Sequence, residues 1–576
     1  MKNEAIVRTL TELADVMELL GESPFRVRAF RTASRTIEGL SGPVVEKLEK
    51  EEPMRGIGDG VIRRIQELVK TGKLEELEEA RKKLPPGLFD LMSLPGVGIK
   101  TAQQFWKDRG ITTIDELENA AKEGKLRDLP RFSEKKEEKL LASIVQWRKR
   151  ASAPKRWPMA IGLDLAEAIC ARMRALPNVE ECQFAGSLRR RRDTVGDLDI
   201  LVAANASSAV AIMDAFTTMG EVSEILAKGE TKSSVILEGG IQCDVRVIAK
   251  ESFGAALQYF TGSKDHNVAM RTIAVKKGLK VSEYGVFDKS GKSLAGETEE
   301  GVYEAIGLTY MAPELRENRG EIEASKTESL PVLVELSDLI GDLHMHTTET
   351  DGRSSLEEMV EAAQKAGRKY IAITEHSQAL SIARGVTPER LKEHVKRIRA
   401  LDEKLGGKFR VLAGLEADIL ADGSMDLAEH LEGLDWVVGS VHSKLDMPRE
   451  QMTKRVVKAI ESGLIDVVGH PTGRMLGQRE ESALDLDDVF AALKRTGTAI
   501  ELNCSPMRLD ISESGARMAR DLGVPVVLSS DAHSTRELGF LRYGIGIARR
   551  AWLGPEHVLT TRTVRQLADW RHTRAS

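Results

Sequence analysis

The chain has 576 residues, of which 41% are hydrophobic and 30% charged, and its formal net charge is -5. This length is enough for about three to five domains, and the composition excludes a largely disordered chain. Without an overall basic excess, any surface for nucleic acid must be local. The four cysteines are scattered, which excludes a disulfide framework. No apolar run suggests a signal core or a membrane span, so we expect a soluble cytoplasmic protein that contacts no membrane.

The first 150 residues read as short helices interrupted by Gly and Pro, the first of them ending at Gly21. Two segments, "RGIGDGVIRRI" (55–65) and "LPGVGIKTAQQFW" (94–106), repeat the order apolar, Gly, apolar, Gly, helix. Such a turn exposes backbone N–H groups at a helix N-terminus, where they bind phosphate without reading sequence. One such segment is as often an ordinary helix–helix turn, but two together favour DNA binding. Residues 129–144 follow the pattern poorly, with Arg131 and Ser133 where glycines are expected.

Residues 160–250 alternate helical and β-rich stretches, which predicts an α/β domain. In "GDLDILV" the carboxylates of Asp197 and Asp199 are two positions apart on a predicted strand and face the same side. The later strand "QCDVRVI" supplies Asp244, and three carboxylates suit two Mg²⁺ or Mn²⁺ ions on a nucleotide. Upstream, Gly186 and Ser187 form a small turn able to meet phosphate oxygens. Asp-x-Asp alone is weak evidence, and the ordered set is stronger.

Four consecutive arginines, Arg189 to Arg192, follow that turn. Arg189 and Arg190 are expected to add positive charge for a triphosphate. The alternative is a solvated loop, and we expect at least one of the four to be only that.

From residue 338 onward, short strands alternate with helices, and each strand-like run ends in a polar or charged residue. Chemistry at the carboxyl ends of repeated βα units predicts a barrel of the TIM type or a relative. Residues 316–337 before it are polar and charged and are expected to be a linker. The strand ends carry ligand-type side chains, including more than half of the 11 histidines: His344, His346, Asp351, His376, Glu416, His442, His470, Asp531 and His533.

Imidazole and carboxylate ligands of this kind suit Zn²⁺, Mn²⁺ or Fe²⁺. For any one histidine, an ordinary core or surface role is the better guess. For the whole set at strand ends, a metal site that hydrolyses phosphate esters is favoured.

The motifs "FAGSLRRRRDTVGDLDILV" (184–202), "KGETKSSV" (228–235) and "LQYFTGSKDHNVAMR" (257–271) resemble those of family X DNA polymerases. The resemblance implies template-directed filling of short gaps in DNA repair, with dNTPs and gapped or primer-template DNA as partners. Asp197, Asp199 and Asp244 would be catalytic. The expected nucleotide-binding residues are Gly186, Ser187, Arg190, Tyr259, Phe260, Gly262 and Asn267. For the two aromatics, plain core packing is the alternative.

The two Gly-containing segments resemble helix-hairpin-helix motifs. The resemblance implies that Gly56, Gly58, Gly96, Gly98 and Lys100 contact DNA. The resemblance to family X polymerases adds Arg271, at the templating region. In several relatives the small N-terminal domain also removes a 5'-deoxyribose phosphate through a lysine Schiff base. Arg64 stands at that lysine position, and a guanidinium stays protonated, so we expect no efficient lyase of this kind.

The C-terminal segments "GDLHMHTTETDG", "YIAITEHS", "GLEADILADGSMDL", "GHPTGR" and "SSDAHS" resemble the polymerase and histidinol phosphatase (PHP) domain. The resemblance implies a distorted (β/α)7 barrel holding up to three metal ions on the nine residues above. Glu375 departs from the family, which often has Asp there. Arg384, Arg474 and Arg508 lie beside these motifs, and each is as readily an ordinary surface arginine as a phosphate ligand.

The resemblance as a whole implies a multidomain α/β chain that acts as a monomer. Its expected parts are a small helical DNA-binding domain (1–80), fingers (81–150), a nucleotidyltransferase palm (151–250), a thumb (251–315), the linker (316–337) and the PHP domain (338–576). The PHP domain is expected to act as a 3'-5' exonuclease or 3'-end phosphodiesterase and to cut at abasic sites. The alternatives are a structural, non-catalytic PHP module, a small-molecule phosphatase fused to a nucleotidyltransferase, and a template-independent or RNA-directed transferase.

Overall fold

The computed structural model describes residues 3–38, 44–49, 57–92, 94, 97–129, 132–151 and 156–575. The chain divides into two compact units, residues 1–154 and 155–576. In the described part of the chain, no helix combines the length and apolar character needed to cross a membrane.

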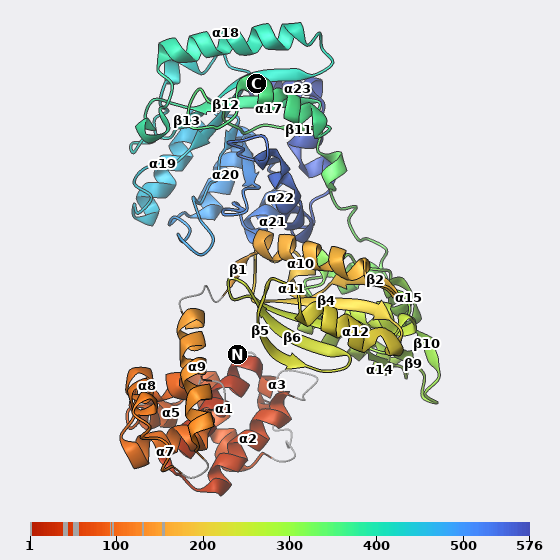
Figure 1. Cartoon of the computed structure of the whole chain (residues 1–576). Helices are drawn as coiled ribbons and strands as arrows, with labels where there is room; N and C mark the ends of the chain where they lie inside the picture. Colours follow the sequence, from red (N-terminus) through yellow and green to blue (C-terminus); the bar gives the residue numbers. More distant parts are fainter. Residues whose placement is uncertain are drawn as a thin grey trace. The chain divides into compact units, whose positions relative to one another are not determined.

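The first unit is helical (Figure 1, red to orange). As expected, its first helix stops before Gly21, which adopts φ 85°. The helices pack around one apolar core that includes Leu10, Ile65 and Phe105. Their bounds are α1 Asn3–Leu20, α2 Pro24–Glu38, α3 Val44–Glu49, α4 Asp59–Thr71, α5 Glu75–Arg81, α6 Leu88–Met92, α7 Ile99–Arg109, α8 Ile114–Lys122 and α9 Glu134–Ala151.

The second unit begins with a five-stranded palm sheet in the order β2-β4-β7-β6-β5. Even-numbered β4 residues such as Ile200 join the core with helices α10 and α12, whereas Leu201 and Ala203 face α13. This alternation leaves one face available to polar side chains at the start of β4. The bounds are α10 Met159–Arg174, β2 Val179–Phe184, α11 Gly186–Arg189, β4 Asp197–Ala204, α12 Ala206–Thr217, β5 Val222–Lys228, β6 Lys232–Leu237 and β7 Gln242–Ile248, with a short pair β1 Trp157–Pro158 and β3 Thr194–Val195.

The thumb follows, with a small antiparallel sheet and helices around a core that includes Met270, Tyr303 and Ile322. Ile322 belongs to α16, which lies inside the predicted linker 316–337, so this part of the segment packs on the thumb rather than running free. The bounds are α13 Phe253–Thr261, α14 Lys264–Lys276, β8 Lys280–Ser282, β9 Gly285–Phe287, β10 Ser293–Ala295, α15 Glu299–Ala305 and α16 Glu321–Lys326.

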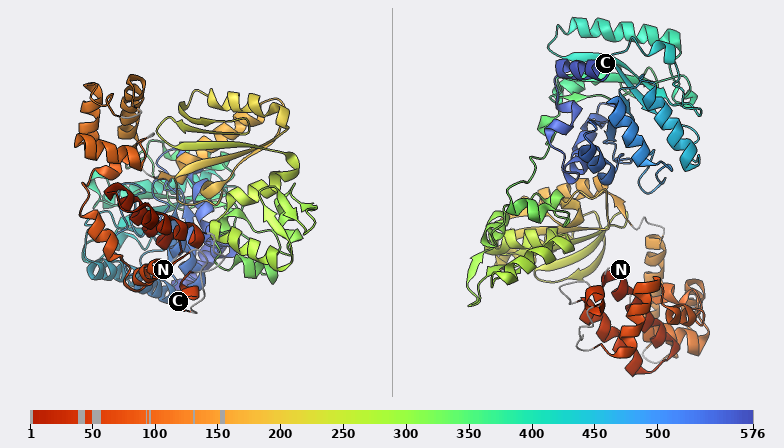
Figure 2. Two further views of the ribbon diagram at one scale, coloured as in Figure 1. Left: turned by 90° about the horizontal axis from the view of Figure 1, so that it is seen from below. Right: turned by 180° about the vertical axis from the view of Figure 1, so that it is seen from behind.

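The C-terminal domain is the expected barrel, with seven parallel strands in sequence order from β11 to β17. Figure 2 shows this domain, coloured green to blue, from two further sides. A parallel bridge between Met345 and Ala532, with hydrogen bonds from Ser530 to Asp342, links the last strand back to the first and nearly closes the barrel. The strands are β11 Gly341–Asp342, β12 Tyr370–His376, β13 Arg410–Asp418, β14 Trp436–Ser440, β15 Val467–Val468, β16 Ala499–Asn503 and β17 Val526–Ser529. The helices are α17 Leu356–Lys365, α18 Pro388–Lys404, α19 Arg449–Glu461, α20 Leu486–Thr496, α21 Glu513–Leu522, α22 Leu541–Arg550 and α23 Val564–Ala575.

Candidate active sites

The three palm carboxylates lie together on two neighbouring strands. Strands β4 and β7 run parallel, and Asp199 stands directly beside Asp244 in their register. Asp197 is one pleat away on the same face of β4. Burial, reinforced by Asp197 and Asp244, raises the pKa of Asp199 to about 6. Such crowding of carboxylates is typical of a site for divalent cations, whose hard oxygen ligands they would be.

Two of these carboxylates have distinct surroundings. Asp244 is paired with Lys232 at 3.1 Å and accepts a hydrogen bond from Gln242. Burial acts to raise the pKa of Asp244, but these contacts outweigh it and lower the pKa. Asp197 is more exposed and stands at the open end of the strand. Asp244 is therefore the carboxylate of the set that stays ionised most readily.

The turn before α11 lies against the carboxylates. Gly186 adopts φ 63°, and a Cβ there would stand 2.7 Å from Asp199 Oδ2. The backbone N–H of Ala185 donates to the carbonyl of Asp199 at 2.7 Å. Gly186 and Ser187 therefore start α11 beside Asp199.

The arginines after this turn point to different partners. Arg189 donates to both oxygens of Glu299, at 2.9 and 2.6 Å. Arg190 donates from Nε to Glu317 Oε1 at 3.0 Å and from Nη1 to the carbonyl of Thr261. Its guanidinium is thus held by the thumb side of the palm, and its role at a triphosphate stays a prediction.

The "YFTGS" segment ends α13 and packs on the palm face. Tyr259 and Phe260 make an edge-to-face pair with ring centres 5.1 Å apart, and Arg246 stacks over Phe260 at 4.6 Å. Both aromatic residues are only partly buried, and Phe260 packs against the core cluster that contains Phe253. Gly262 follows with φ 67°.

The helix after this turn carries the other two predicted residues. Asn267 donates to the carbonyl of Tyr259 at 2.7 Å and so braces the turn. Arg271 is exposed one helical turn further along α14. The segment therefore presents a partly exposed aromatic pair, and the hydrogen bond from Asn267 stabilises the backbone beside it.

The predicted DNA-binding segments start helices without a side-chain cap. Gly58 precedes α4 and Gly98 precedes α7, and a Cβ on either would meet nothing within 4 Å. Lys100 is exposed on the first turn of α7. The other two predicted glycines, Gly56 and Gly96, and also Arg131, lie outside the described residues. Both helix starts thus offer uncapped N–H groups and open space to a phosphate.

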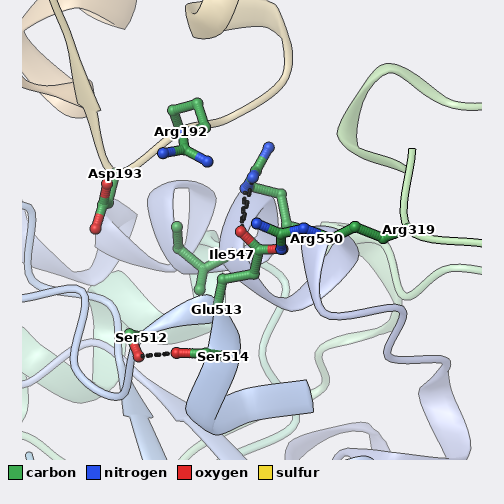
Figure 3. A pocket seen from close by; sticks show the side chains of 8 residues that line it. All are labelled: Arg192, Asp193, Arg319, Ser512, Glu513, Ser514, Ile547 and Arg550. Atoms are coloured by element: carbon green, nitrogen blue, oxygen red, sulfur yellow. Dashed lines mark hydrogen bonds and ion pairs between the residues drawn. The ribbon is translucent and has the colours of Figure 1, made fainter. Parts of the chain in front are cut away.

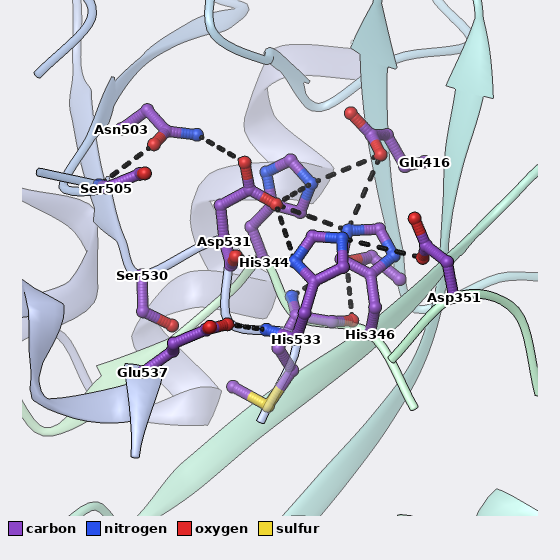
Figure 4. A network of polar contacts seen from close by, with 12 residues as sticks. His344, His346, Asp351, Glu416, Asn503, Ser505, Ser530, Asp531, His533 and Glu537 are labelled. Atoms are coloured by element: carbon purple, nitrogen blue, oxygen red, sulfur yellow. Dashed lines mark hydrogen bonds and ion pairs between the residues drawn. The ribbon is translucent and has the colours of Figure 1, made fainter. Parts of the chain in front are cut away.

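In the barrel, the predicted ligands meet at one end of the strands, and Figure 4 shows many of them converging. Three sets of ligand atoms come within 4.8 Å of one another: His346, Asp351, His376 and His533; His344, His346 and Glu416; and His376, Glu416 and His442. His470 Nε2 lies 2.9 Å from Glu416 Oε1, and Asp531 Oδ1 lies 3.3 Å from His346 Nε2. All nine residues therefore belong to one cluster.

The cluster suits metal ions better than hydrogen bonds. Its buried atoms without a hydrogen-bond partner, among the described residues, include His344 Nε2, both ring nitrogens of His346, His376 Nδ1, His470 Nδ1 and Glu416 Oε2. His376 Nδ1 is only 2.7 Å from Glu416 Oε2, yet the pair lacks hydrogen-bond alignment. Buried polar atoms without a hydrogen-bond partner are costly, and cations bound between these side chains would offset part of that cost.

The protonation of the cluster differs between its members. Burial acts to lower the pKa of His344, His376, His442 and His533, but nearby carboxylates outweigh it and raise the pKa, so metal binding would displace protons from these rings. Burial, reinforced by His376 and His533, lowers the pKa of His346 to about 4, so its ring offers a free lone pair at neutral pH. Burial acts to raise the pKa of Glu416, but His442, His376 and His344 overcome this and hold it well below its usual range. Neutral imidazole and ionised carboxylate are the forms that bind divalent metals.

Sequence reasoning missed the residues behind the ligands. Glu501 accepts from His344 Nδ1 at 2.6 Å and from the backbone N–H of His470, and so orients two ligands. Asp418 lies 3.2 Å from His442 Nδ1. Asp418 ends β13 two residues after Glu416, a spacing that signals the same face, whereas Glu501 lies in the middle of β16. Glu375, the departure from the family, accepts from Thr347 and supports the loop below the cluster.

The three arginines beside the motifs differ in what they do. Arg474 is buried and donates to the carbonyls of Arg508 and Leu509, so it is structural. Arg384 donates to the carbonyl of Thr350. Arg508 alone lies against a predicted ligand, with Nε 3.7 Å from Asp531 Oδ2, and it remains partly exposed. Of the three, Arg508 is placed to meet a phosphate at the cluster.

A palm with three carboxylates, a thumb, and a barrel with a histidine–carboxylate cluster define a nucleotidyltransferase joined to a PHP phosphoesterase. Family models agree: a helix-hairpin-helix domain matches residues 1–74, a SAM-like helix-hairpin-helix tandem 88–144, the DNA polymerase beta thumb 256–317 and the PHP domain 342–505. The chain is 37% identical over 571 residues to the DNA polymerase/3'-5' exonuclease PolX of Bacillus subtilis (strain 168), covering 98% of this chain and 99% of that protein.

Shorter matches cover about two fifths of the chain. A probable phosphatase of Thermoanaerobacter sp. (strain X514) is 28% identical over 235 residues, 39% of this chain and 91% of that protein. One of Vibrio cholerae serotype O1 (strain M66-2) is 28% identical over 245 residues, 40% of this chain and 93% of that protein. The full-length match decides the family: the chain belongs to the family X DNA polymerases that carry a PHP domain.

Proposed function

We propose that this polymerase fills short gaps during DNA repair and that its PHP domain shortens or cleans 3' ends as a 3'-5' exonuclease. The observation that supports this pairing is the presence in one chain of two separate clusters, Asp197, Asp199 and Asp244 on the palm and the nine-residue set in the barrel. The Bacillus relative carries both activities in its name. Uncapped helix starts at Gly58 and Gly98 would hold the DNA backbone.

At the palm, the residues would divide the work as follows. Asp197, Asp199 and Asp244 would hold two Mg²⁺ or Mn²⁺ ions, which supply charge stabilisation for the phosphates and activate the primer 3'-hydroxyl. Gly186 and Ser187 would bind the triphosphate through the N–H groups at the start of α11. The Tyr259–Phe260 pair would lie along the sugar, where its flat shape leaves little room for a 2'-hydroxyl.

In the barrel, the nine ligands would hold up to three ions of Zn²⁺, Mn²⁺ or Fe²⁺, which supply Lewis-acid stabilisation and a water activated for attack. Glu501 keeps His344 in the tautomer whose Nε2 lone pair faces the cluster. Arg508 would bind a phosphate oxygen of the DNA end. The same phosphodiester chemistry would serve abasic-site cutting, and a duplex with a single abasic site tests that part. We take the working form as a monomer, which sedimentation tests.

The test uses the purified chain with Mn²⁺ on two labelled substrates: a one-nucleotide gapped duplex with dNTPs and a single-stranded 3' end without them. Asp197→Ala is expected to abolish extension alone, and His344→Ala to abolish shortening alone. Matched controls are Asp214→Ala on the palm and His430→Ala in the barrel, both exposed and outside the clusters. If a folded His344→Ala protein still shortens DNA, the barrel is not the nuclease, and a structural PHP module is the better account.

A further inference from the structure

Arg550, at the end of α22 in the PHP domain, reaches into the palm and thumb. Its side chain is only 1% exposed. Nη1 donates to the carbonyl of Arg190 at 2.6 Å and to Glu317 Oε1 at 2.9 Å. On its other side, Nε and Nη2 donate to Glu513 Oε2 at 3.0 and 2.7 Å. One guanidinium fork therefore joins the PHP domain to the residue expected to bind the triphosphate.

Glu317 connects Arg550 to Arg190, the residue expected to bind the triphosphate. Its Oε1 accepts from Arg550 Nη1 and also from Arg190 Nε at 3.0 Å, so the carboxylate stands between two arginines. Burial acts to raise the pKa of Glu317, but these arginines outweigh it and lower the pKa, so the carboxylate is charged. Arg190 in turn donates to the carbonyl of Thr261.

The two segments that would hold the nucleotide meet at this point. Arg190 directly follows α11, whose first residues are Gly186 and Ser187. Thr261 precedes Gly262 in the "YFTGS" turn, and its hydroxyl accepts from Arg189 at 2.8 Å. The position of the expected triphosphate helix relative to the sugar-side turn thus depends on the Arg189–Arg190 pair, and Arg190 depends on Glu317 and Arg550.

The space around Arg550 is not filled by other side chains of the described residues that could take over its hydrogen bonds. A cavity of about 200 Å³ opens beside Arg550 and Glu513 (Figure 3), lined also by Arg192 and Arg319. A shorter or apolar side chain at position 550 would leave the carbonyl of Arg190 and one side of Glu317 without a donor, next to open space. Buried acceptors that lose their donor favour a rearranged backbone.

We propose that Arg550, although it belongs to the PHP domain, is a positioning residue of the polymerase site. By holding Glu317 and the backbone of Arg190, it fixes α11 and the "YFTGS" turn in the arrangement that binds the incoming dNTP. The inference rests on the proposed nucleotide role of Gly186, Ser187 and Arg190. It predicts that a change in the PHP domain, remote from the palm carboxylates, weakens dNTP binding and leaves the nuclease alone.

The experiment measures single-nucleotide gap filling by the full chain for wild type, Arg550→Met and Arg550→Lys. In Arg550→Met the KM for dNTP is expected to rise about tenfold or more, with a smaller change in kcat, because the lost contacts act on binding geometry. Arg550→Lys keeps the charge but not the fork, so partial rescue is expected. Exonuclease activity on a single-stranded 3' end, without dNTP, is expected within about twofold of wild type in both.

Arg549→Gln is the matched control. Arg549 is the neighbouring residue of the same helix and pairs with Glu314 at 2.8 Å across the same interface, but it does not touch Arg190 or Glu317. It is expected to leave the KM for dNTP unchanged. Melting curves and the nuclease assay establish that each variant is folded.

The outcomes separate this inference from the proposed function. If wild type extends no primer, or Asp197→Ala still extends, the proposed function fails before Arg550 is considered. If wild type extends and a folded Arg550→Met protein keeps the wild-type KM for dNTP, the positioning role is overturned. An equal rise of KM in Arg549→Gln would also overturn it, because the effect would then belong to the interface in general.

Discussion

At the scale of single residues, Gly186 is the position where a methyl group does most harm to the polymerase. Its φ of 63° and the 2.7 Å approach to Asp199 Oδ2 both oppose a Cβ. In Gly186→Ala, we expect gap filling to fall at least about a hundredfold, since the clash displaces a carboxylate as well as the turn. Shortening of single-stranded DNA should be unaffected.

The same substitution at Gly220 serves as its control. Gly220 lies in the palm after α12, and nothing stands within 4 Å of a Cβ there. Gly220→Ala should fill gaps at the wild-type rate. Equal losses of gap filling in the two variants would show that any glycine-to-alanine change in the palm reduces activity. The turn at Gly186 would then have no special role.

Glu501 acts on the barrel cluster through its ligands. It is 1% exposed and bonds His344 Nδ1 and the backbone N–H of His470. Loss of such a supporting carboxylate usually costs about 10- to 100-fold in metal affinity or activity. We expect Glu501→Gln to lose bound metal, measured by elemental analysis, and exonuclease activity to the same degree, with gap filling retained.

Glu480→Gln, an exposed change in the same domain, should keep both metal and activity. Full metal content with lost nuclease in Glu501→Gln would show that Glu501 does not act through metal binding.

At the scale of elements, α4 bears on whether the N-terminal unit is a lyase. Arg64 on this helix is ion-paired with Glu76 and donates to the carbonyl of Gly60 at 2.8 Å. A guanidinium in such a pair does not become a nucleophile. We expect borohydride to trap no covalent adduct between the chain and DNA that carries a 5'-deoxyribose phosphate. Robust trapping, abolished by changing a lysine of this unit, would contradict this.

Helices α14 and α16 of the thumb are joined by a buried histidine. His266 lies between Glu321, 2.7 Å from Nδ1, and the hydroxyl of Tyr303, 2.9 Å from Nε2. Burial is the main cause that lowers the pKa of His266, and Glu321 only partly offsets it. The ring is therefore neutral when folded, with Nδ1–H donating to Glu321 and Nε2 accepting from Tyr303.

This arrangement predicts a thumb that weakens in mild acid. Unfolded histidine takes up a proton near pH 6.5, whereas folded His266 does so only at a lower pH. The unfolded state thus binds more protons below about pH 6.5, and stability falls from there down to the folded pKa. The protection factors of α14 amides against hydrogen exchange, which correct for the intrinsic pH dependence of exchange, should fall over that range in wild type. His266→Gln should be less stable at neutral pH but should lack this part of the pH dependence.

At the scale of the whole molecule, the sequence was a good guide to what lies along one strand or one turn. The alternation of β4 placed Asp197 and Asp199 on one face, and strand ends gathered the barrel ligands, because both follow from local periodicity. The segment 316–337 was read as a linker because it is polar, yet Glu321 and Ile322 pack into the thumb.

What the sequence did not reveal depends on contacts between distant segments. Glu501 meets His344 across the barrel, and Arg550 meets Arg190 across 360 positions of the chain. Arg474 resembles a phosphate ligand by its place beside a motif, but loop carbonyls occupy its guanidinium. No local pattern of residue types distinguishes these cases, since the partner and not the residue decides the role.

Two of the barrel's predicted ligands have positive φ angles, which residues other than glycine seldom adopt. His470 adopts φ 23° and Asp531 φ 52°, in the left-handed region, which is unfavourable for side chains of this size. Removing metal should therefore lower the melting temperature of the barrel selectively, because metal bound to the folded state offsets this strain. Calorimetry with and without a chelator measures it, and the N-terminal unit, outside the cluster, serves as the internal reference.

The consequence is a trade-off, at single residues, between the thermal stability of the barrel and its capacity to bind metal. Asp531, a predicted ligand, stands where glycine would suit the backbone better, so a metal-binding role at this position would come at the expense of intrinsic stability. Asp531→Gly should accordingly make the metal-free barrel more heat-resistant while it destroys the nuclease. Selection for thermal robustness alone would drift toward an inert barrel, and only a continuing need for its activity would keep the aspartate in place.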